Sequence, residues 1–147
     1  MIRDLPDLVA VQEFGAAIAN ELRPGDVIAL SGGLGAGKTT LARSILAALG
    51  HRGEVPSPTF TIVETYDCPP LSFPVVHADF YRLERPEEAL ELGLEDYRDG
   101  AALIAEWPEL AGGFAHEPTC LSIKLEIVGQ GRRAIVDPGP DWVERLP

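Results

Sequence analysis

A glycine-rich segment constrains the fold of this chain more than any other feature of its 147 residues. Residues 31–40 read SGGLGAGKTT and match the pattern G-x-x-x-x-G-K-[ST]. The apolar run DVIALSG leads into the glycines, and the helix-like run TTLARSILAALG, which ends at Gly50, follows them. This order of strand, loop and helix is the setting in which the pattern binds phosphate, so it predicts a phosphate-binding loop.

The residues of the loop indicate a nucleoside triphosphate as the ligand. Glycines let the backbone wrap around a phosphate, and the following helix points its positive end at the anion. We expect Lys38 to reach the terminal phosphates and the Thr39 hydroxyl to hold Mg²⁺. The other residues expected at the phosphates are Gly33, Leu34, Gly35, Ala36, Gly37 and Thr40. Because the chain lacks the Asn/Thr-Lys-x-Asp element that usually reads guanine, ATP is the expected nucleotide.

Two acidic residues at the ends of apolar runs are candidates for the metal site and for catalysis, together with Lys38. Asp79 ends PVVHAD, and an aspartate at the end of a strand beside the loop strand commonly supports the nucleotide-bound metal. Glu106 ends ALIAE and is either a surface residue or one that orients metal or water. His77 shares a strand face with Asp79 and is interpreted as a hydrogen-bonded structural residue.

Two further residues have one structural and one functional interpretation each. Thr59 lies in PSPTF, after the helix that follows the loop, where many NTPases have a segment that senses the γ-phosphate. The two prolines of this segment are equally typical of a rigid turn without function. Trp107 follows Glu106 and is interpreted as a core aromatic residue rather than one that stacks near a nucleotide.

The rest of the chain alternates between strand and helix patterns. Residues 7–22 carry apolar side chains at three- and four-residue intervals, which is typical of an amphipathic helix. The runs 60–67, 73–81 and 101–107 have the length and composition of strands. The acidic segment 85–97 is predicted to be a helix between the last two of them.

The end of the chain predicts antiparallel strands. Segments 119–128 and 132–137 alternate between apolar and polar residues on either side of the turn sequence GQG, which predicts a C-terminal β-hairpin. We therefore expect an α/β, three-layer P-loop NTPase-like fold with a mixed, mostly parallel sheet. Residues 1–147 are expected to form a single P-loop ATPase domain.

Composition limits the classes of partner. The chain has 23 acidic and 12 basic residues and a net charge of −11, so its surface repels polyanions, and any nucleic-acid role requires a basic partner. Cys68 and Cys120 form no CxxC pair, which argues against a disulfide framework and a structural zinc site. The N-terminal sequence has the pattern of neither a signal peptide nor a membrane span, so we expect a cytoplasmic protein without membrane contact.

Taken together, these motifs resemble the TsaE family, also called YjeE, the small P-loop ATPases of bacterial tRNA threonylcarbamoyladenosine synthesis. The resemblance runs through LRPGDVIALSGGLGAGKTTLAR, SPTFTIVETY, HADFYRLERPEE, LGLEDY and LIAEWPE, which lie within residues 22–109. The loop alone is shared by many NTPases, but SPTF, H-x-D-x-Y-R-L and EWPE make the resemblance specific. The stretch after residue 110 matches only as a β-hairpin.

The resemblance implies both a function and a set of residue roles. It implies that the protein binds ATP and Mg²⁺, hydrolyses ATP slowly when alone, and works with TsaB-type and TsaD-type partners. Transfer RNA would be reached only indirectly, through those partners. By position, the resemblance implies Lys38 at phosphate, Thr39 and Asp79 at Mg²⁺, Glu106 at metal or water, and Thr59 in a switch-like loop.

One residue departs from the family pattern. Relatives usually carry aspartate where this chain has Gly33. The replacement removes a negative charge from the phosphate loop and adds backbone freedom. We therefore expect ATP binding to be retained and hydrolysis to be altered.

Two other functions remain open on the sequence alone. A small-molecule P-loop kinase needs the same loop and metal carboxylate, but it generally also carries an arginine-rich lid. The arginines of RLERPEEALELGLEDYRD alternate with acids instead, which is more typical of a solvated or docking helix. A regulatory module that binds ATP without turning it over is the other alternative, and it would leave Glu106 dispensable.

Overall fold

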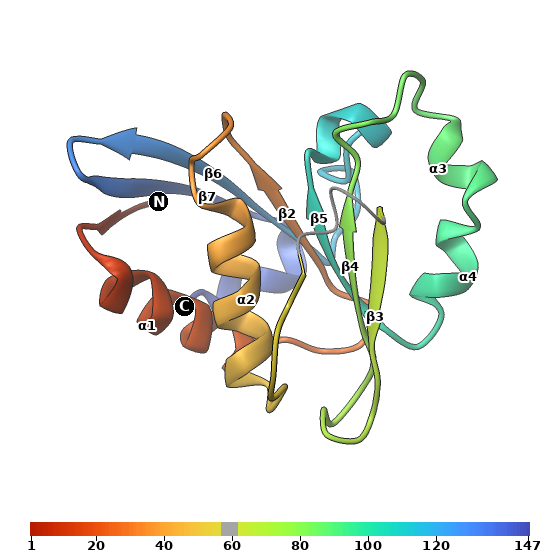
Figure 1. Ribbon diagram of the computed structural model, residues 1–147, viewed down its shortest axis with the longest axis horizontal. Coiled ribbons are helices and arrows are strands. Elements are labelled where there is room, and N and C mark those ends of the chain that lie inside the picture. Colours follow the sequence, from red (N-terminus) through yellow and green to blue (C-terminus); the bar gives the residue numbers. More distant parts are fainter. Residues whose placement is uncertain (57–61) are drawn as a thin grey trace.

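A seven-stranded sheet organises the computed structural model, which describes residues 1–56 and 62–147 (Figure 1). The strands are β1 (Ile2–Leu5), β2 (Val27–Ser31), β3 (Val63–Tyr66), β4 (Val75–Asp79), β5 (Ala102–Glu106), β6 (Cys120–Val128) and β7 (Gly131–Pro138). The α-helices are α1 (Leu8–Glu21), α2 (Lys38–Ala48), α3 (Glu88–Glu91) and α4 (Leu94–Arg98), and the 3₁₀ helices are η1 (Pro108–Ala111) and η2 (Pro140–Arg145).

The sheet is parallel at its centre and antiparallel at its edges. Its order is β1-β7-β6-β2-β5-β4-β3. Strands β6, β2, β5 and β4 run parallel, whereas β7 and β1 extend one edge antiparallel and β3 extends the other. The predicted mixed sheet and the predicted hairpin of β6 and β7 are therefore confirmed.

Helices cover both faces of the sheet, so the predicted three-layer fold is also confirmed. Figure 1 shows α1 and α2 on one side of the sheet and α3 and α4 on the other. Alternate residues of β2 point to opposite faces, as the pleat of a strand requires. Ile28 belongs to the same buried cluster as Leu41 of α2. Ala29 belongs to the opposite cluster, with Leu94 of α4.

The structure corrects the sequence prediction in two places. The acidic segment 85–97 is not one helix but the two short helices α3 and α4, because Gly93 between them adopts a left-handed conformation with φ of +76°. Strand β1 was not predicted, and it forms because Ile2–Leu5 pairs antiparallel with the edge strand β7.

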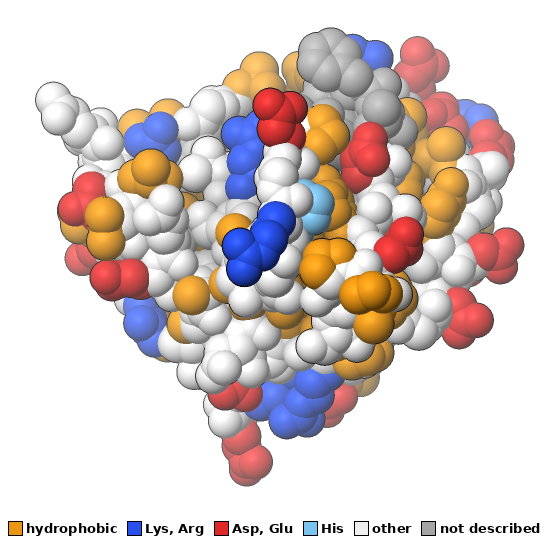
Figure 2. All heavy atoms as spheres, turned by 60° about the horizontal axis from the view of Figure 1, so that its bottom comes forward, with side chains coloured by type: hydrophobic (Ala, Val, Ile, Leu, Met, Phe, Trp, Pro, Cys, Tyr) orange, Lys and Arg blue, Asp and Glu red, His pale blue; other side chains and the backbone are white. Residues whose placement is uncertain are grey.

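The charge of the molecule is unevenly distributed over its surface. The first turns of α3 and α4 carry Glu88, Glu91, Glu95 and Asp96. Figure 2 shows acidic side chains gathered on the right-hand side of the view, the side on which these helices lie in Figure 1. Among residues 1–56 and 62–147, no helix has the length and apolar character needed to cross a membrane.

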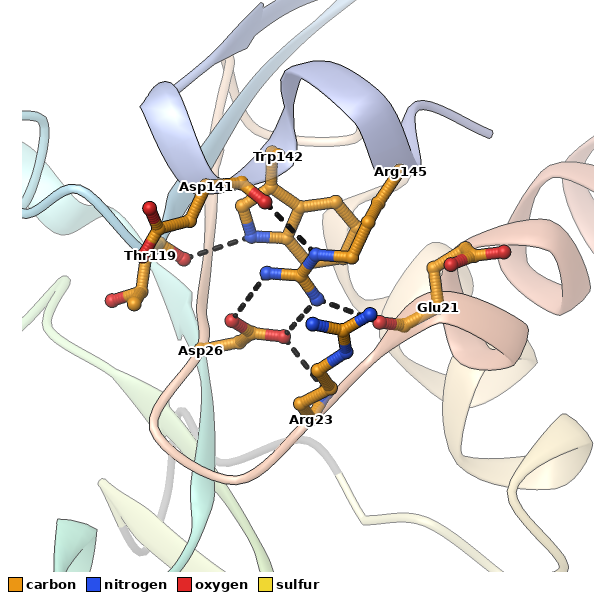
Figure 3. A network of polar contacts seen from close by, with 7 residues as sticks. All are labelled: Glu21, Arg23, Asp26, Thr119, Asp141, Trp142 and Arg145. Carbon is orange, nitrogen blue, oxygen red and sulfur yellow. Dashed lines mark hydrogen bonds and ion pairs between the residues drawn. The ribbon is translucent and has the colours of Figure 1, made fainter.

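A buried ion pair ties the C-terminal end of the structure to the start of β2 (Figure 3). Arg145 of η2 donates to the two carboxylate oxygens of Asp26 at 2.8 and 3.0 Å, and to the backbone oxygen of Glu21 at 2.7 Å. The carboxylate of Asp26 also accepts from the N–H of Arg23 at 2.7 Å. The guanidinium carbon of Arg145 lies 4.2 Å from the centroid of a Trp142 ring. This network holds the turn that leads into β2 and hence into the phosphate loop.

We predict that Arg145→Ala lowers the free energy of unfolding by about 3–5 kcal/mol, because it leaves the Asp26 carboxylate buried without its cation. Urea denaturation of the native protein and the variant measures this difference. Arg85→Ala is the matched control, since Arg85 is 59% exposed in its 3.3 Å ion pair with Glu91. Its expected cost is within about 1 kcal/mol. Equal losses in the two variants would contradict the role given to the buried pair.

Candidate functional site

The glycine loop lies between the end of β2 at Ser31 and the start of α2 at Lys38. At least two of the glycines in this loop are required by the backbone conformation. Gly32 has φ of +135°, and a Cβ added there would lie 2.4 Å from the carbonyl oxygen of Leu125. Gly37, at the N-cap of α2, has φ of +101°. Residues with a side chain are strained in both conformations, so glycine at these positions gives the loop its shape.

Most of the predicted site residues line one cavity of about 270 Å³. Its walls are Leu34, Gly35, Gly37, Lys38, Thr39, Thr40, Asp79, Glu106, Trp107 and Arg132. Of the other predicted residues, Gly33 contributes its carbonyl oxygen to a hydrogen bond with Lys38, and Ala36 is buried at a neighbouring cavity. Thr59 lies outside the described residues.

Strand register brings the two candidate carboxylates to the loop. In the parallel pairing of β4 with β5, Asp79 is opposite Glu106. In the parallel pairing of β2 with β5, Leu30 is opposite Glu106. The carboxyl ends of all three strands therefore meet at one edge of the sheet, where α/β proteins commonly bind ligands. Both carboxylates are buried, with Asp79 4% and Glu106 2% exposed.

Glu106 connects the loop helix to a buried histidine. Its Oε1 accepts a hydrogen bond from the Thr39 hydroxyl at 2.8 Å, and its Oε2 lies 2.6 Å from Nε2 of His77. An ionised carboxylate can only accept, so the imidazole donates from Nε2. His77 is fully buried, in keeping with the interpretation of it as a hydrogen-bonded structural residue. Its partner was not evident from the sequence.

Lys38 lies at the centre of the site. Its Nζ donates to the carbonyl oxygens of Gly32 and Gly33, each at 2.8 Å, and lies 4.5 Å from the Trp107 ring centroid. Burial lowers the pKa of Lys38 from its ordinary value, and the charges of Glu106 and Asp79 oppose that shift. The site therefore combines one buried cation with two buried acids.

Trp107 forms part of the site rather than only part of the core. It adopts a left-handed backbone conformation with φ of +55°, and its ring lies 5.0 Å from that of Tyr81. The N–H of Tyr81 in turn donates to Oδ1 of Asp79 at 2.9 Å. The ring also packs against the core on the α3 and α4 side of the sheet, so the prediction of a core aromatic residue describes one of its two environments.

Arg132 was not predicted as a site residue, and it contacts the loop from β7. Its Nε donates to the carbonyl oxygen of Ala36 and its Nη2 to that of Gly35, each at 3.1 Å. Arg132 also lines a second cavity of about 180 Å³. Apolar side chains in that second cavity come from Leu5, Leu8, Val11, Ala36, Leu41 and Leu125. The two cavities share Gly37, Thr40 and Arg132, so they adjoin at the start of α2.

The donors in the first cavity suit a hard cation. Mg²⁺ keeps several waters and usually takes only one or two protein carboxylates together with phosphate oxygens. Thr39, Asp79 and Glu106 supply oxygens of these kinds within one cavity. In the part of the chain that the structure describes, no group of three His, Cys, Asp or Glu residues could hold a metal ion by itself. The donor set therefore fits Mg²⁺ carried with a phosphate ligand.

Comparisons with known proteins agree with one another. Residues 5–135 match the family model of the threonylcarbamoyl adenosine biosynthesis protein TsaE. Proteins named tRNA threonylcarbamoyladenosine biosynthesis protein TsaE are similar in sequence. That of Haemophilus influenzae is 40% identical over 124 residues, which cover 80% of this chain and 77% of the relative. That of Rickettsia felis is 36% identical over 117 residues, which cover 79% and 67%.

A solved structure extends this similarity to the fold. The crystal structure of YdiB from Bacillus subtilis superposes with a TM-score of 0.78. The superposition covers 99% of this chain and 90% of YdiB, at 27% sequence identity. The similarity therefore includes the C-terminal hairpin as well as the motifs of the first three quarters of the chain.

We predict that Gly32→Ala lowers the free energy of unfolding by about 2–4 kcal/mol, because the new Cβ meets the carbonyl of Leu125 and the backbone is strained. Gly33→Ala is the neighbouring control. A Cβ at Gly33 has no atom within 4 Å, so a change within about 1 kcal/mol is expected. Denaturation in guanidinium chloride distinguishes the two variants. A tolerated Gly32→Ala would show that the hairpin does not confine the loop.

Proposed function

The chain belongs to the TsaE family of threonylcarbamoyl adenosine biosynthesis proteins, and from this premise we propose that it binds and hydrolyses ATP in tRNA threonylcarbamoyladenosine biosynthesis. Residues 1–147 act as a single P-loop ATPase domain. The observation that carries this proposal is the cavity in which Lys38, Thr39, Asp79 and Glu106 come together. A phosphate loop beside two buried carboxylates has the parts that nucleoside triphosphate hydrolysis requires.

ATP binds across both cavities. Its phosphates lie in the first cavity, where the N-terminal N–H groups of α2 and the ammonium of Lys38 stabilise negative charge. Phosphate oxygens compete there with the carbonyl oxygens of Gly32 and Gly33 for the Lys38 ammonium. The base lies against the apolar walls of the adjoining cavity, which include Leu8 and Leu41.

Thr39, Asp79 and Glu106 would hold Mg²⁺ at the phosphates, where a bound metal would supply neutralisation of phosphoryl charge. Glu106 also orients the attacking water. The bond from His77 holds the Glu106 carboxylate in one orientation at 2.6 Å. A Cβ added at Gly33 would have no atom within 4 Å, so the side chain usual in relatives could start there without a clash. The altered hydrolysis expected from Gly33 remains a prediction.

The chain acts through partners of the TsaB and TsaD types, and these partners bring it to tRNA. A net charge of −11 disfavours direct contact with nucleic acid. Two of the three arginines of RLERPEEALELGLEDYRD, Arg85 and Arg98, do not support the alternative of a small-molecule kinase. Arg85 pairs with Glu91 at 3.3 Å, and Arg98 pairs with Glu117 at 2.5 Å. Both side chains therefore form ion pairs within the protein, whereas the arginines of a phosphate-binding lid contact the substrate.

We predict that ATP hydrolysis by the native protein is slow alone and rises at least tenfold when TsaB-type and TsaD-type partners are added. The assay follows phosphate release while small-molecule acceptors are screened for phosphorylation. Lys38→Ala, which removes the phosphate-binding cation, is the control and should abolish turnover in both conditions. A phosphorylated acceptor formed without the partners would identify a kinase instead. Binding of ATP without any turnover in the complete mixture would identify a regulatory module.

A further inference from the structure

Arg132 contacts the phosphate loop from β7, outside β2 and α2, the strand and helix that flank the loop. The guanidinium donates to two successive carbonyl groups of the loop, those of Gly35 and Ala36, each at 3.1 Å. A third bond, from Nη1 to the carbonyl oxygen of the preceding residue Gly131 at 2.9 Å, holds the side chain against the backbone of β7. Nε also lies 3.8 Å from the position of a Cβ on Gly37, so the guanidinium packs against that glycine.

The position of Arg132 is fixed by the strands on both sides of it. In the register of the sheet, Arg132 is opposite Leu5 of β1 and opposite Ile127 of β6. The preceding residue, Gly131, lies so close to β1 that an added Cβ would come within 2.8 Å of Pro6. The hairpin also confines the start of the loop, where Leu125 approaches Gly32. Arg132 therefore acts on the loop from a rigid base.

The two bonds orient the peptide groups of the loop. In a trans peptide the C=O of one residue and the N–H of the next point in opposite directions. Because Arg132 holds the carbonyls of Gly35 and Ala36, the N–H groups of Ala36 and Gly37 face away from it. The N–H of Ala36 donates to the carbonyl oxygen of Gly33 at 3.2 Å, which closes the turn. The planar guanidinium presents its donors in a fixed fork that matches the two successive carbonyls, whereas the donors of an ammonium have no such fixed arrangement.

We propose that Arg132 is a positioning residue that holds the phosphate loop in the shape that binds the phosphates of ATP. This inference rests on the proposed function, because it assumes that the loop binds nucleotide. It assigns to the C-terminal hairpin a part in nucleotide binding through the two loop carbonyls. Because the loop has this shape before ATP binds, the free-energy cost of ordering the loop on binding is smaller.

The test measures ATP affinity by calorimetry, in the presence of Mg²⁺, for the native protein and for Arg132→Met, Arg132→Lys and Arg133→Met. Arg132→Met should bind ATP about tenfold or more weakly, because both bonds to the loop are lost. Arg132→Lys keeps the charge but not the fixed fork of donors, so it should also bind ATP more weakly than the native protein. Arg133 is the matched control on the same strand, with its Nε 3.5 Å from Asp4, and its variant should bind like the native protein.

A second measurement separates positioning from a general loss of stability. The rise in melting temperature caused by saturating ATP should be smaller in Arg132→Met than in Arg133→Met, whatever their melting temperatures without nucleotide. Native-like ATP affinity in Arg132→Met would overturn the inference. So would native-like affinity in Arg132→Lys beside a loss in Arg132→Met, since charge alone would then suffice. If the native protein itself binds no ATP, the proposed function fails and this inference fails with it.

Discussion

The parallel pairing of β2 with β5 joins the phosphate loop to the acidic end of the neighbouring strand. It places Glu106 opposite Leu30, at the point where the phosphate loop leaves the sheet. The N–H of Trp107 then donates to the carbonyl oxygen of Leu30 at 3.2 Å, so the chain leaves β5 beside the loop. Without this register, the bond from Thr39 to Glu106 could not form. The positions of Glu106 and Trp107 at the loop thus follow from this strand pairing, and the pairing of β4 with β5 adds Asp79.

The site contains buried side chains of both charge signs. Lys38, Asp79 and Glu106 are each 5% exposed or less, and an isolated charge at such a position is costly. Each has protein partners that reduce this cost. The lysine binds two loop carbonyls, Asp79 accepts from a backbone N–H, and Glu106 accepts from Thr39 and His77. Buried polar groups satisfied in this way hold fixed positions, which a phosphate site requires.

Local patterns made the phosphate loop and the two strand-terminal acids predictable. The glycine spacing is a property of consecutive residues, and Asp79 and Glu106 each end an apolar run. Contacts that depend on distant pairing were not predictable. Arg132 reaches the loop only because β6 lies parallel to β2 and carries β7 beside it, and no sequence pattern reports that arrangement. The break at Gly93 was missed because a single glycine is also tolerated inside a helix.

A single-turnover ATPase measurement on Glu106→Gln, with the partners present, tests whether Glu106 joins the loop to the chemistry of hydrolysis. Glutamine keeps the size of the side chain and its capacity to accept a hydrogen bond from Thr39, but it lacks the negative charge. We predict hydrolysis slower by about a hundredfold or more, with ATP affinity within about threefold of native. A native rate in Glu106→Gln would show instead that the carboxylate serves only the packing of the site.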